Sequence, residues 1–159
     1  MASKLKKLKE IRSLVGGLKQ SGKKIVFTNG CFDILHYGHV KYLEKCKRLG
    51  DILIVGLNSD SSVRKIKGKG RPVTGEKERA ALLSALAAVD YIAIFSEPTP
   101  AILIDTITPD ILVKGGDWKG RNIAGSVHVE SHGGTVTCVP FVKGYSTTRI
   151  LKRIKRRAF

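Results

Sequence analysis

Two histidines three residues apart, His36 and His39, have the residue type and spacing best suited to phosphate chemistry in this chain. They stand in the string GCFDILHYGH with Gly38 between them, directly after a short apolar run and before a helical pattern. Residues three apart share one face of a helix, and the unpaired N–H groups of a first helical turn attract phosphate oxygens. Imidazoles placed there can donate hydrogen bonds to charge that builds on a phosphoryl group. The pattern predicts a phosphate-binding corner; the alternative is a pair of histidines that serves only packing and turn geometry.

A second set of candidate phosphate contacts begins the last helical pattern, at the STT of Ser146–Thr148. Hydroxyls at a helix start also cap exposed N–H groups, so capping alone is an equal alternative for this motif. Lys47 follows His39 by just over two helical turns, and we expect its side chain to reach back along the same face. Metal binding by Cys31 with the histidines is a weaker alternative, because the sequence holds no matching second pair of ligands. The absence of GxxxxGK[ST] excludes a P-loop enzyme, and the absence of GxGxxG after the first strand disfavours dinucleotide hydride transfer.

The elements that must position these residues alternate along the chain. Strands are expected at 24–28, 51–57, 91–95, 111–114 and 135–139, and helices at 39–49, 76–89, 100–107, 123–131 and 146–155. Strands separated by helices of this length predict right-handed crossovers and a parallel sheet. We therefore expect an α/β fold, a single doubly wound Rossmann-like domain with a five-stranded parallel sheet and helices on both faces. Residues 1–22 are expected to form an N-terminal helical extension to a domain of residues 23–159.

Small, polar and basic residues follow four of the five expected strands, whereas the opposite strand ends carry mostly short charged turns. Parallel sheets bind ligands beyond the carboxyl ends of their strands, where the strand order reverses. This asymmetry predicts a ligand site at the carboxyl edge, because a purely structural domain has no need of it.

The net charge of +16, from 29 basic and 13 acidic residues, predicts an anionic partner. Nucleic acid, anionic lipid and phosphorylated small molecules all fit such a charge, and a solvated surface is the alternative. A nucleic-acid-binding module is disfavoured, because aromatic residues make up only 6% of the chain and are not interleaved with the basic clusters. It remains an alternative function. Three scattered cysteines argue against a disulfide framework. With no apolar run long enough to span a bilayer and no signal-peptide pattern, we expect a cytoplasmic protein.

Together these motifs resemble the cytidylyltransferase-like nucleotidyltransferase superfamily, whose members share an HxGH and an STT motif. The wider strings FTNGCFDILHYGHVKYLEKCKRLGD, GLNSDSSVRKIKGKGRPV, LVKGGDW, IAGS and GYSTT are similar to heptose 1-phosphate adenylyltransferases, from about Lys24 to Ile154. The resemblance implies transfer of AMP from ATP to D-glycero-D-manno-heptose 1-phosphate, giving ADP-heptose and pyrophosphate for the lipopolysaccharide core. It is closest to the free-standing form, without a kinase domain, and makes residues 23–159 the nucleotidyltransferase domain.

Two departures from related patterns qualify this resemblance. Glycerol-3-phosphate cytidylyltransferases tend to carry an arginine three residues before the glycine of their STT motif, where this chain has Phe141. That difference favours the heptose branch, and a nucleotidyltransferase with another phosphorylated acceptor remains the alternative. Arg121 and Asn122 stand where the heptose enzymes would be expected to have an acidic residue, which leaves the contacts around the KGGDW loop open.

The resemblance also implies roles for individual residues. The catalytic set is His36, His39 and Lys47. The nucleotide-binding set is Thr28, Asn29, Gly30, Cys31, Phe32, Gly38, Lys114, Gly115, Gly116, Asp117, Trp118, Ser146, Thr147 and Thr148. The sugar-phosphate set is Asp33, Asn58, Asp60, Arg71 and Arg79, with a helix-surface charge beside Glu78 as an even alternative for Arg79. Mg²⁺ is expected with ATP, bridging its phosphates mostly through water and not in a metal site on the protein. The expected partners are ATP, a sugar 1-phosphate and a second copy in a dimer, with no membrane and no specific nucleic acid.

Overall fold

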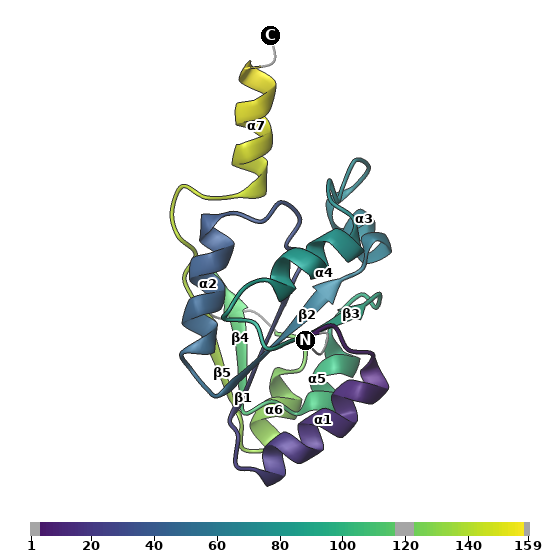
Figure 1. The fold of residues 1–159 in the computed structure, drawn as a ribbon, viewed down its shortest axis with the longest axis vertical. Coiled ribbons are helices and arrows are strands. Elements are labelled where there is room, and N and C mark those ends of the chain that lie inside the picture. Colours follow the sequence, from purple (N-terminus) through teal and green to yellow (C-terminus); the bar gives the residue numbers. More distant parts are fainter. Residues whose placement is uncertain (1–3, 117–122, 158–159) are drawn as a thin grey trace.

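Five parallel strands form the centre of the molecule, in the order β3-β2-β1-β4-β5. The computed structural model describes residues 4–116 and 123–157. The strands are β1 (Ile25–Gly30), β2 (Ile52–Asn58), β3 (Tyr91–Phe95), β4 (Ile111–Gly115) and β5 (Thr135–Val139). The chain runs from β1 to β2 on one side and enters β4 on the other, so the strand order reverses between β1 and β4 (Figure 1). Ligands of doubly wound sheets bind beyond the strand ends at such a point.

Helices cover both faces of the sheet, as the sequence predicts (Figure 1). They are α1 (Leu8–Gln20), α2 (Tyr37–Lys47), α3 (Asp60–Lys67), α4 (Glu76–Ser84), α5 (Ala101–Ile107), α6 (Ser126–Ser131) and α7 (Thr147–Arg157). The apolar residues of α2 and α4 form one core cluster with alternate strand residues such as Val26 and Val113. Those of α1, α5 and α6 form a second cluster on the other face, with Phe27 and Leu112. The predicted fold class is confirmed.

The N-terminal helix α1 packs into the core rather than beside it. Ile11 is fully buried and Val15 is nearly so, and both belong to the same cluster as Ile104 and Ile107 of α5. The chain before α1 also pairs with the sheet, since Leu5 forms an isolated bridge to Ile92 of β3. The expected extension of residues 1–22 is therefore joined to the sheet by its apolar face in the part that the structure describes.

One helix was not predicted, and another is clearly shorter than predicted. The helix α3, in the Gly- and Lys-rich segment, was not predicted, because Val63 and Ile66 are its only apolar residues and give no periodic pattern. Its first turn is secured instead by Ser59, whose hydroxyl accepts from the N–H of Ser62. The helix α4 ends at Ser84, before the predicted Val89, because the chain turns there to enter β3.

The last helix, α7, contributes nothing to the core. None of its residues is buried, and it extends away from the body of the domain in Figure 1. Its first residues lie at the carboxyl edge of the sheet, next to the start of α2. No helix in the described part of the chain is both long and apolar enough to cross a membrane.

Candidate active site

A cavity of about 400 Å³ opens where the strand order reverses, beyond the carboxyl ends of β1 and β4. Its walls come from the loop after β1, the start of α2, the segment before α4 and the start of α7. The lining residues are Asn29, Gly30, Cys31, Phe32, Asp33, His36, Gly38, His39, Tyr42, Lys67, Arg71, Gly115, Phe141, Val142, Tyr145, Ser146, Thr147 and Thr148. The structure thus brings together both histidines, Arg71, the STT motif and most of the residues expected to bind the nucleotide.

The two histidines are held as a stacked pair at the start of α2. His36 is the N-cap, with its Nδ1 accepting from the N–H of His39 at 3.3 Å. The two imidazole rings stack with centroids 3.7 Å apart and planes 15° apart. Gly38 makes this possible, because a Cβ there would meet atoms of the His36 ring at 3.1 Å and Cβ of Tyr145 at 3.0 Å. The glycine between the histidines therefore lets the first imidazole fold down over the helix start.

Both histidines are neutral at physiological pH in this arrangement. Burial, with a smaller contribution from the neighbouring His36, lowers the pKa of His39 to about 4. Burial also lowers the pKa of His36. His39 Nδ1 is buried without a hydrogen-bond partner among the described residues. A neutral imidazole has one N–H donor, so the pair offers hydrogen bonds to an anion without a full positive charge.

Asp33 holds the segment Gly68–Gly75, which we call the strap, against the cavity. Its carboxylate accepts from the N–H groups of Val73 and Thr74 at 2.7 and 3.0 Å and pairs with Arg71 Nε at 2.5 Å. Burial would raise the pKa of Asp33, but these hydrogen bonds and the Arg71 charge lower it overall. Asp33 is 2% exposed, so its carboxylate is used by the strap rather than presented to a ligand. Asp33 thus positions Arg71, which lines the cavity beside it, and a direct contact of Asp33 with the substrate stays a prediction.

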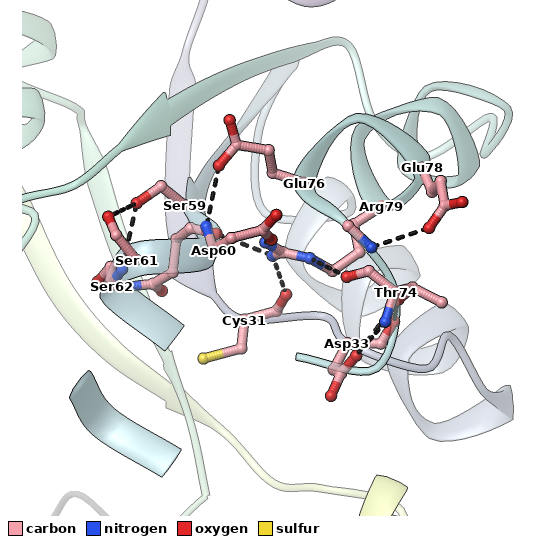
Figure 2. Close-up of polar contacts among 12 residues, drawn as sticks. Cys31, Asp33, Ser59, Asp60, Ser61, Ser62, Thr74, Glu76, Glu78 and Arg79 are labelled. Carbon is pink, nitrogen blue, oxygen red and sulfur yellow. Dashed lines mark hydrogen bonds and ion pairs between the residues drawn. The ribbon is translucent and has the colours of Figure 1, made fainter. Parts of the chain in front are cut away.

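Arg79 is a buried clamp and not a cavity residue. The residue is 1% exposed, and its guanidinium donates to the carbonyls of Thr74 (3.0 Å), Cys31 (2.6 Å) and Asn58 (2.8 Å) and to Asp60 Oδ1 (2.7 Å). Figure 2 shows Arg79 among Thr74, Cys31 and Asp60. Both earlier interpretations of Arg79, as a sugar-phosphate contact and as a surface charge, are wrong. One side chain instead joins the loop after β1, the end of β2, the start of α3 and the strap.

The side chains of Asn58 and Asp60 also bind other groups of the protein. Asn58 Nδ2 donates to Ser62 Oγ at 3.0 Å, and Asp60 is the ion-pair partner of Arg79. Neither residue lines the cavity. They shape the loops behind it, and the prediction that they contact the sugar phosphate is corrected on that ground.

Lys47 lies at the opposite end of α2 from the histidines. Its ammonium pairs with Asp90 at 2.5 Å and also donates to the carbonyl of Asp51, both of which precede strands. Two helical turns separate it from His39, and its side chain runs toward the amino edge of the sheet rather than back along the helix. The prediction that Lys47 reaches the phosphate corner is wrong.

Comparison with known proteins places the whole arrangement in a family. Residues 27–153 match the profile of the family described as Cytidylyltransferase-like. The chain belongs to the cytidylyltransferase-like family. It is 52% identical over 155 residues to the bifunctional protein HldE of Syntrophotalea carbinolica and 54% identical over 150 residues to that of Campylobacter jejuni subsp. doylei. These matches cover 98% and 94% of this chain but 32% of each relative, so the chain spans about a third of their length.

Two solved structures share the fold of this cytidylyltransferase-like domain. The lipopolysaccharide core biosynthesis protein of Thermoplasma volcanium is 36% identical, with a TM-score of 0.64 over 79% of this chain and 100% of that one. The pantoate-beta-alanine ligase of Francisella tularensis, solved with beta-gamma ATP and beta-alanine, has a TM-score of 0.60 over 98% of this chain and 78% of that one. At 17% identity the second likeness concerns the fold alone. The predicted resemblance to the superfamily is confirmed.

The other residues predicted to bind the nucleotide fall into two groups, those that line the cavity and those that lie behind its wall. Asn29 and Gly115 line the cavity, whereas Thr28 is fully buried and its hydroxyl bonds the Tyr42 hydroxyl at 2.7 Å. Gly116 lies outside the lining with a φ of +81°, against the Phe141 ring. Lys114 lies behind Asn29 and bonds its side chain. Asp117 and Trp118, like Arg121 and Asn122, lie outside the described residues.

Sequence reasoning missed several lining residues. Tyr42 was not among the predicted site residues, and Lys67 is one of several lysines in a basic cluster with nothing to single it out. Phe141 and Tyr145 are 60% and 50% exposed, and their rings lie against Tyr42 and Tyr37, at centroid distances of 5.8 and 5.0 Å. The aromatic wall of the cavity could not be predicted, because it is assembled from α2 and the segment before α7.

The donor set of the cavity suits a phosphorylated ligand. Imidazoles, hydroxyls, an exposed lysine and a guanidinium line it, and its lining carboxylate, Asp33, is occupied by the strap. Within residues 4–116 and 123–157, no group of three or more His, Cys, Asp and Glu side chains is arranged to hold a metal ion. Burial raises the pKa of Cys31, which keeps this lining thiol protonated and poorly nucleophilic.

Proposed function

We propose that this chain transfers AMP from ATP to D-glycero-D-manno-heptose 1-phosphate, giving ADP-heptose and pyrophosphate. The observation that carries the proposal is the gathering of stacked neutral histidines, the STT hydroxyls and Arg71 around one cavity at the sheet's reversal point. The relatives named HldE, at 52–54% identity, and a lipopolysaccharide core biosynthesis protein at 36% identity support the heptose pathway over other acceptors.

The reaction needs no covalent intermediate with the protein. An oxygen of the sugar phosphate attacks the α-phosphorus of ATP, a new P–O bond forms, and the bond from the α-phosphorus to the bridging oxygen breaks. Pyrophosphate takes the electron pair and leaves in line with the attacking oxygen. The sugar phosphate is already ionised at neutral pH, so no general base is required. Catalysis then consists of positioning the two phosphates and stabilising the negative charge of the transition state.

The histidine pair and the start of α7 hold the triphosphate in this proposal. His36 and His39 donate to oxygens near the α- and β-phosphates, where charge builds as the bond breaks. The STT hydroxyls and the unpaired N–H groups of the first turn of α7 bind the β- and γ-phosphates. Mg²⁺ would enter with ATP as the MgATP substrate and would neutralise part of the charge of the triphosphate.

Arg71 and Lys67 receive the acceptor phosphate. Asp33 holds Nε of Arg71, which leaves the two terminal nitrogens of that guanidinium without partners among the described residues. Lys67 lines the same cavity from the end of α3 and is exposed. Two cations from adjacent segments can attract a phosphate dianion and hold its attacking oxygen near the α-phosphorus.

We also propose that the protein acts in the cytoplasm as a homodimer. All three cysteines are free thiols, which suits a reducing compartment. The apolar residues of α7, Ile150, Leu151 and Ile154, lie on a helix with no buried residue, and a second copy would cover them. Light scattering of the purified protein tests this: a monomer mass at micromolar concentration would contradict the dimer.

The function is tested by incubating the pure protein with MgATP and each anomer of the heptose 1-phosphate while pyrophosphate release is followed. Turnover with one heptose anomer and ATP is expected. A parallel reaction with CTP and glycerol 3-phosphate tests the cytidylyltransferase alternative. Turnover only in that second reaction would overturn the proposal.

A further inference from the structure

Lys114, near the end of β4, is a buried cation with a single neutral partner. It is 9% exposed, and its ammonium donates to Asn29 Oδ1 on the adjacent strand β1. No carboxylate of the described residues forms an ion pair with it, although the other buried basic side chain, Arg79, has Asp60. Buried charges in proteins are ordinarily paired. The counter-charge of Lys114 is missing from the described protein.

This cation lies at the place where the fold binds ligands. Thr28 and Val113 are register partners, so Asn29 and Lys114 follow them at the carboxyl ends of β1 and β4, where the strand order reverses. Asn29 itself lines the cavity. A methionine of similar length would fill the same space without the charge, so packing does not explain a lysine at this position.

The lysine decides how the Asn29 amide is oriented. An ammonium group can only donate hydrogen bonds, so the amide oxygen of Asn29 must face Lys114. Both N–H donors of that amide are then left for a ligand of the cavity. No described residue accepts a hydrogen bond from them. Without Lys114, the Asn29 amide could turn either its oxygen or its N–H groups toward the cavity. Lys114 holds the amide oxygen, so the N–H groups face the ligand, and the ammonium adds a positive charge behind them.

We propose that Lys114 and Asn29 form a phosphate subsite at the β1–β4 crevice, in which Lys114 is a positioning residue and Asn29 makes the contact. The phosphate of the ligand supplies the counter-charge that the buried ammonium lacks. The subsite rests on the proposed function for the identity of its ligands, MgATP and the sugar 1-phosphate. The existence of the subsite rests on the geometry alone. Ligand binding measured without turnover therefore tests the subsite separately from the proposed reaction.

The titration of Lys114 gives the subsite a signature. Burial lowers the pKa of Lys114 to about 8. Two titratable side chains of α2, Tyr42 and Cys46, belong to the core on this side of the sheet. Burial raises the pKa of Tyr42 and raises that of Cys46 to about 12, so neither supplies a negative charge to Lys114 at neutral pH. Phosphate affinity should fall as pH rises through about 8.

Calorimetry measures the binding of MgATP and of the heptose 1-phosphate separately. The proteins compared are the wild type, Lys114→Met, Lys114→Arg, Asn29→Ala and the double variant Lys114→Met/Asn29→Ala. Lys114→Met should weaken the ligand that occupies the subsite about tenfold or more at neutral pH. In the double variant, Lys114→Met should lower affinity much less relative to Asn29→Ala alone, because the lysine acts through the asparagine. Lys77→Met, on the exposed side of α4, is the matched control and should bind as the wild type does.

Thermal unfolding distinguishes this role from a structural one. Removing an uncompensated buried charge should leave the melting temperature of Lys114→Met equal to or above that of the wild type at pH 7. The difference should shrink at higher pH, where the wild-type lysine has lost its proton. Lys114→Arg, if it folds, should keep its affinity as pH rises. Unchanged affinity of Lys114→Met for both ligands, or a lower melting temperature with normal affinity, would overturn the proposal. Loss of MgATP binding in the wild type would instead refute the proposed function.

Discussion

At the scale of single residues, the histidine pair and the arginine on the strap do different work. His39 is mostly buried against His36, and its lowered pKa keeps it neutral over the whole physiological range. Arg71 keeps a permanent charge and is fixed by Asp33 at one nitrogen. We infer that the histidines serve the transition state, where charge develops, and that the arginine serves binding of an anion that is charged from the start.

His39→Ala should therefore lower kcat about tenfold to a hundredfold, because one lost donor to the transition state removes a few kcal/mol of stabilisation. The KM values should change less. Circular dichroism should show an intact fold, and His132→Ala, at an exposed histidine in the turn after α6, is the matched control. Near-normal turnover of His39→Ala would remove the histidine from the catalytic set.

Arg71→Ala should raise the KM for the sugar phosphate by about tenfold or more, since a charge-assisted hydrogen bond is lost. The KM for ATP should change far less. Lys69→Ala, at an exposed lysine of the same strap that does not line the cavity, serves as the control. Equal increases in the KM of both substrates would mean that Arg71 contributes only to the general positive charge of the surface and does not bind the sugar phosphate.

At the scale of elements, the cavity depends on loops that one buried side chain fastens together. Arg79 reaches from α4 to the loop after β1, the end of β2 and the strap, and Glu76 adds a hydrogen bond from the N–H of Asp60 at 2.9 Å (Figure 2). Arg79 bonds the Asn58 carbonyl in a buried contact and the Cys31 and Thr74 carbonyls in partly buried ones, and a buried carbonyl without a donor is costly. The acceptor side of the cavity is thus held in place from behind.

Arg79→Met should lower the free energy of unfolding by about 3 kcal/mol, because it leaves Asp60 and the three carbonyls without their donor. Arg79→Lys should recover little of this, since an ammonium cannot span the four acceptors as a planar guanidinium does. Chemical denaturation measures both, with Lys77→Met on the exposed side of α4 as the control. If Arg79→Met unfolds at the wild-type denaturant concentration, the clamp has no stabilising role.

At the scale of the whole molecule, the net charge of +16 is concentrated partly on α7, whose last turn carries Lys155, Arg156 and Arg157. The first turn of that helix lines the cavity, and the last turn lies beyond it along the extended helix (Figure 1). Exposed charges farther apart than about 8 Å are screened at physiological salt. The distal charges can attract anionic substrates, but they cannot stabilise the transition state directly.

Deleting residues 155–159 should therefore reduce kcat/KM at about 20 mM salt and have little effect at about 200 mM salt. The comparison of the two salt concentrations is the measurement, and the undeleted chain at each concentration is its control. A loss that persists at the higher salt would place the end of α7 in an active site, that of a neighbouring copy included.

The alternation of strands and helices and the parallel sheet followed from the sequence, because local patterns determine them. Continuous apolar runs such as 52–57 predict buried parallel strands, and short helical periods between them leave few topologies. The positions of His36, His39 and Ser146–Thr148 followed in turn, since each begins a helix directly after a strand or a short connection.

Only the tertiary structure decided which of the polar residues at the carboxyl edge keep hydrogen-bonding groups free for a ligand. Asp33, Asn58, Asp60 and Arg79 have the residue types of a sugar-phosphate site, yet they satisfy one another and the loops. Lys47 was predicted at the carboxyl edge but lies at the amino edge, paired with Asp90. Asp90 is 43 residues away in the chain, and only the pairing of the strands brings it close to Lys47. Sequence spacing fixes the side of an element on which a residue lies. The partner that each charge finds there is set by contacts between distant segments, and these exist only once the sheet has formed.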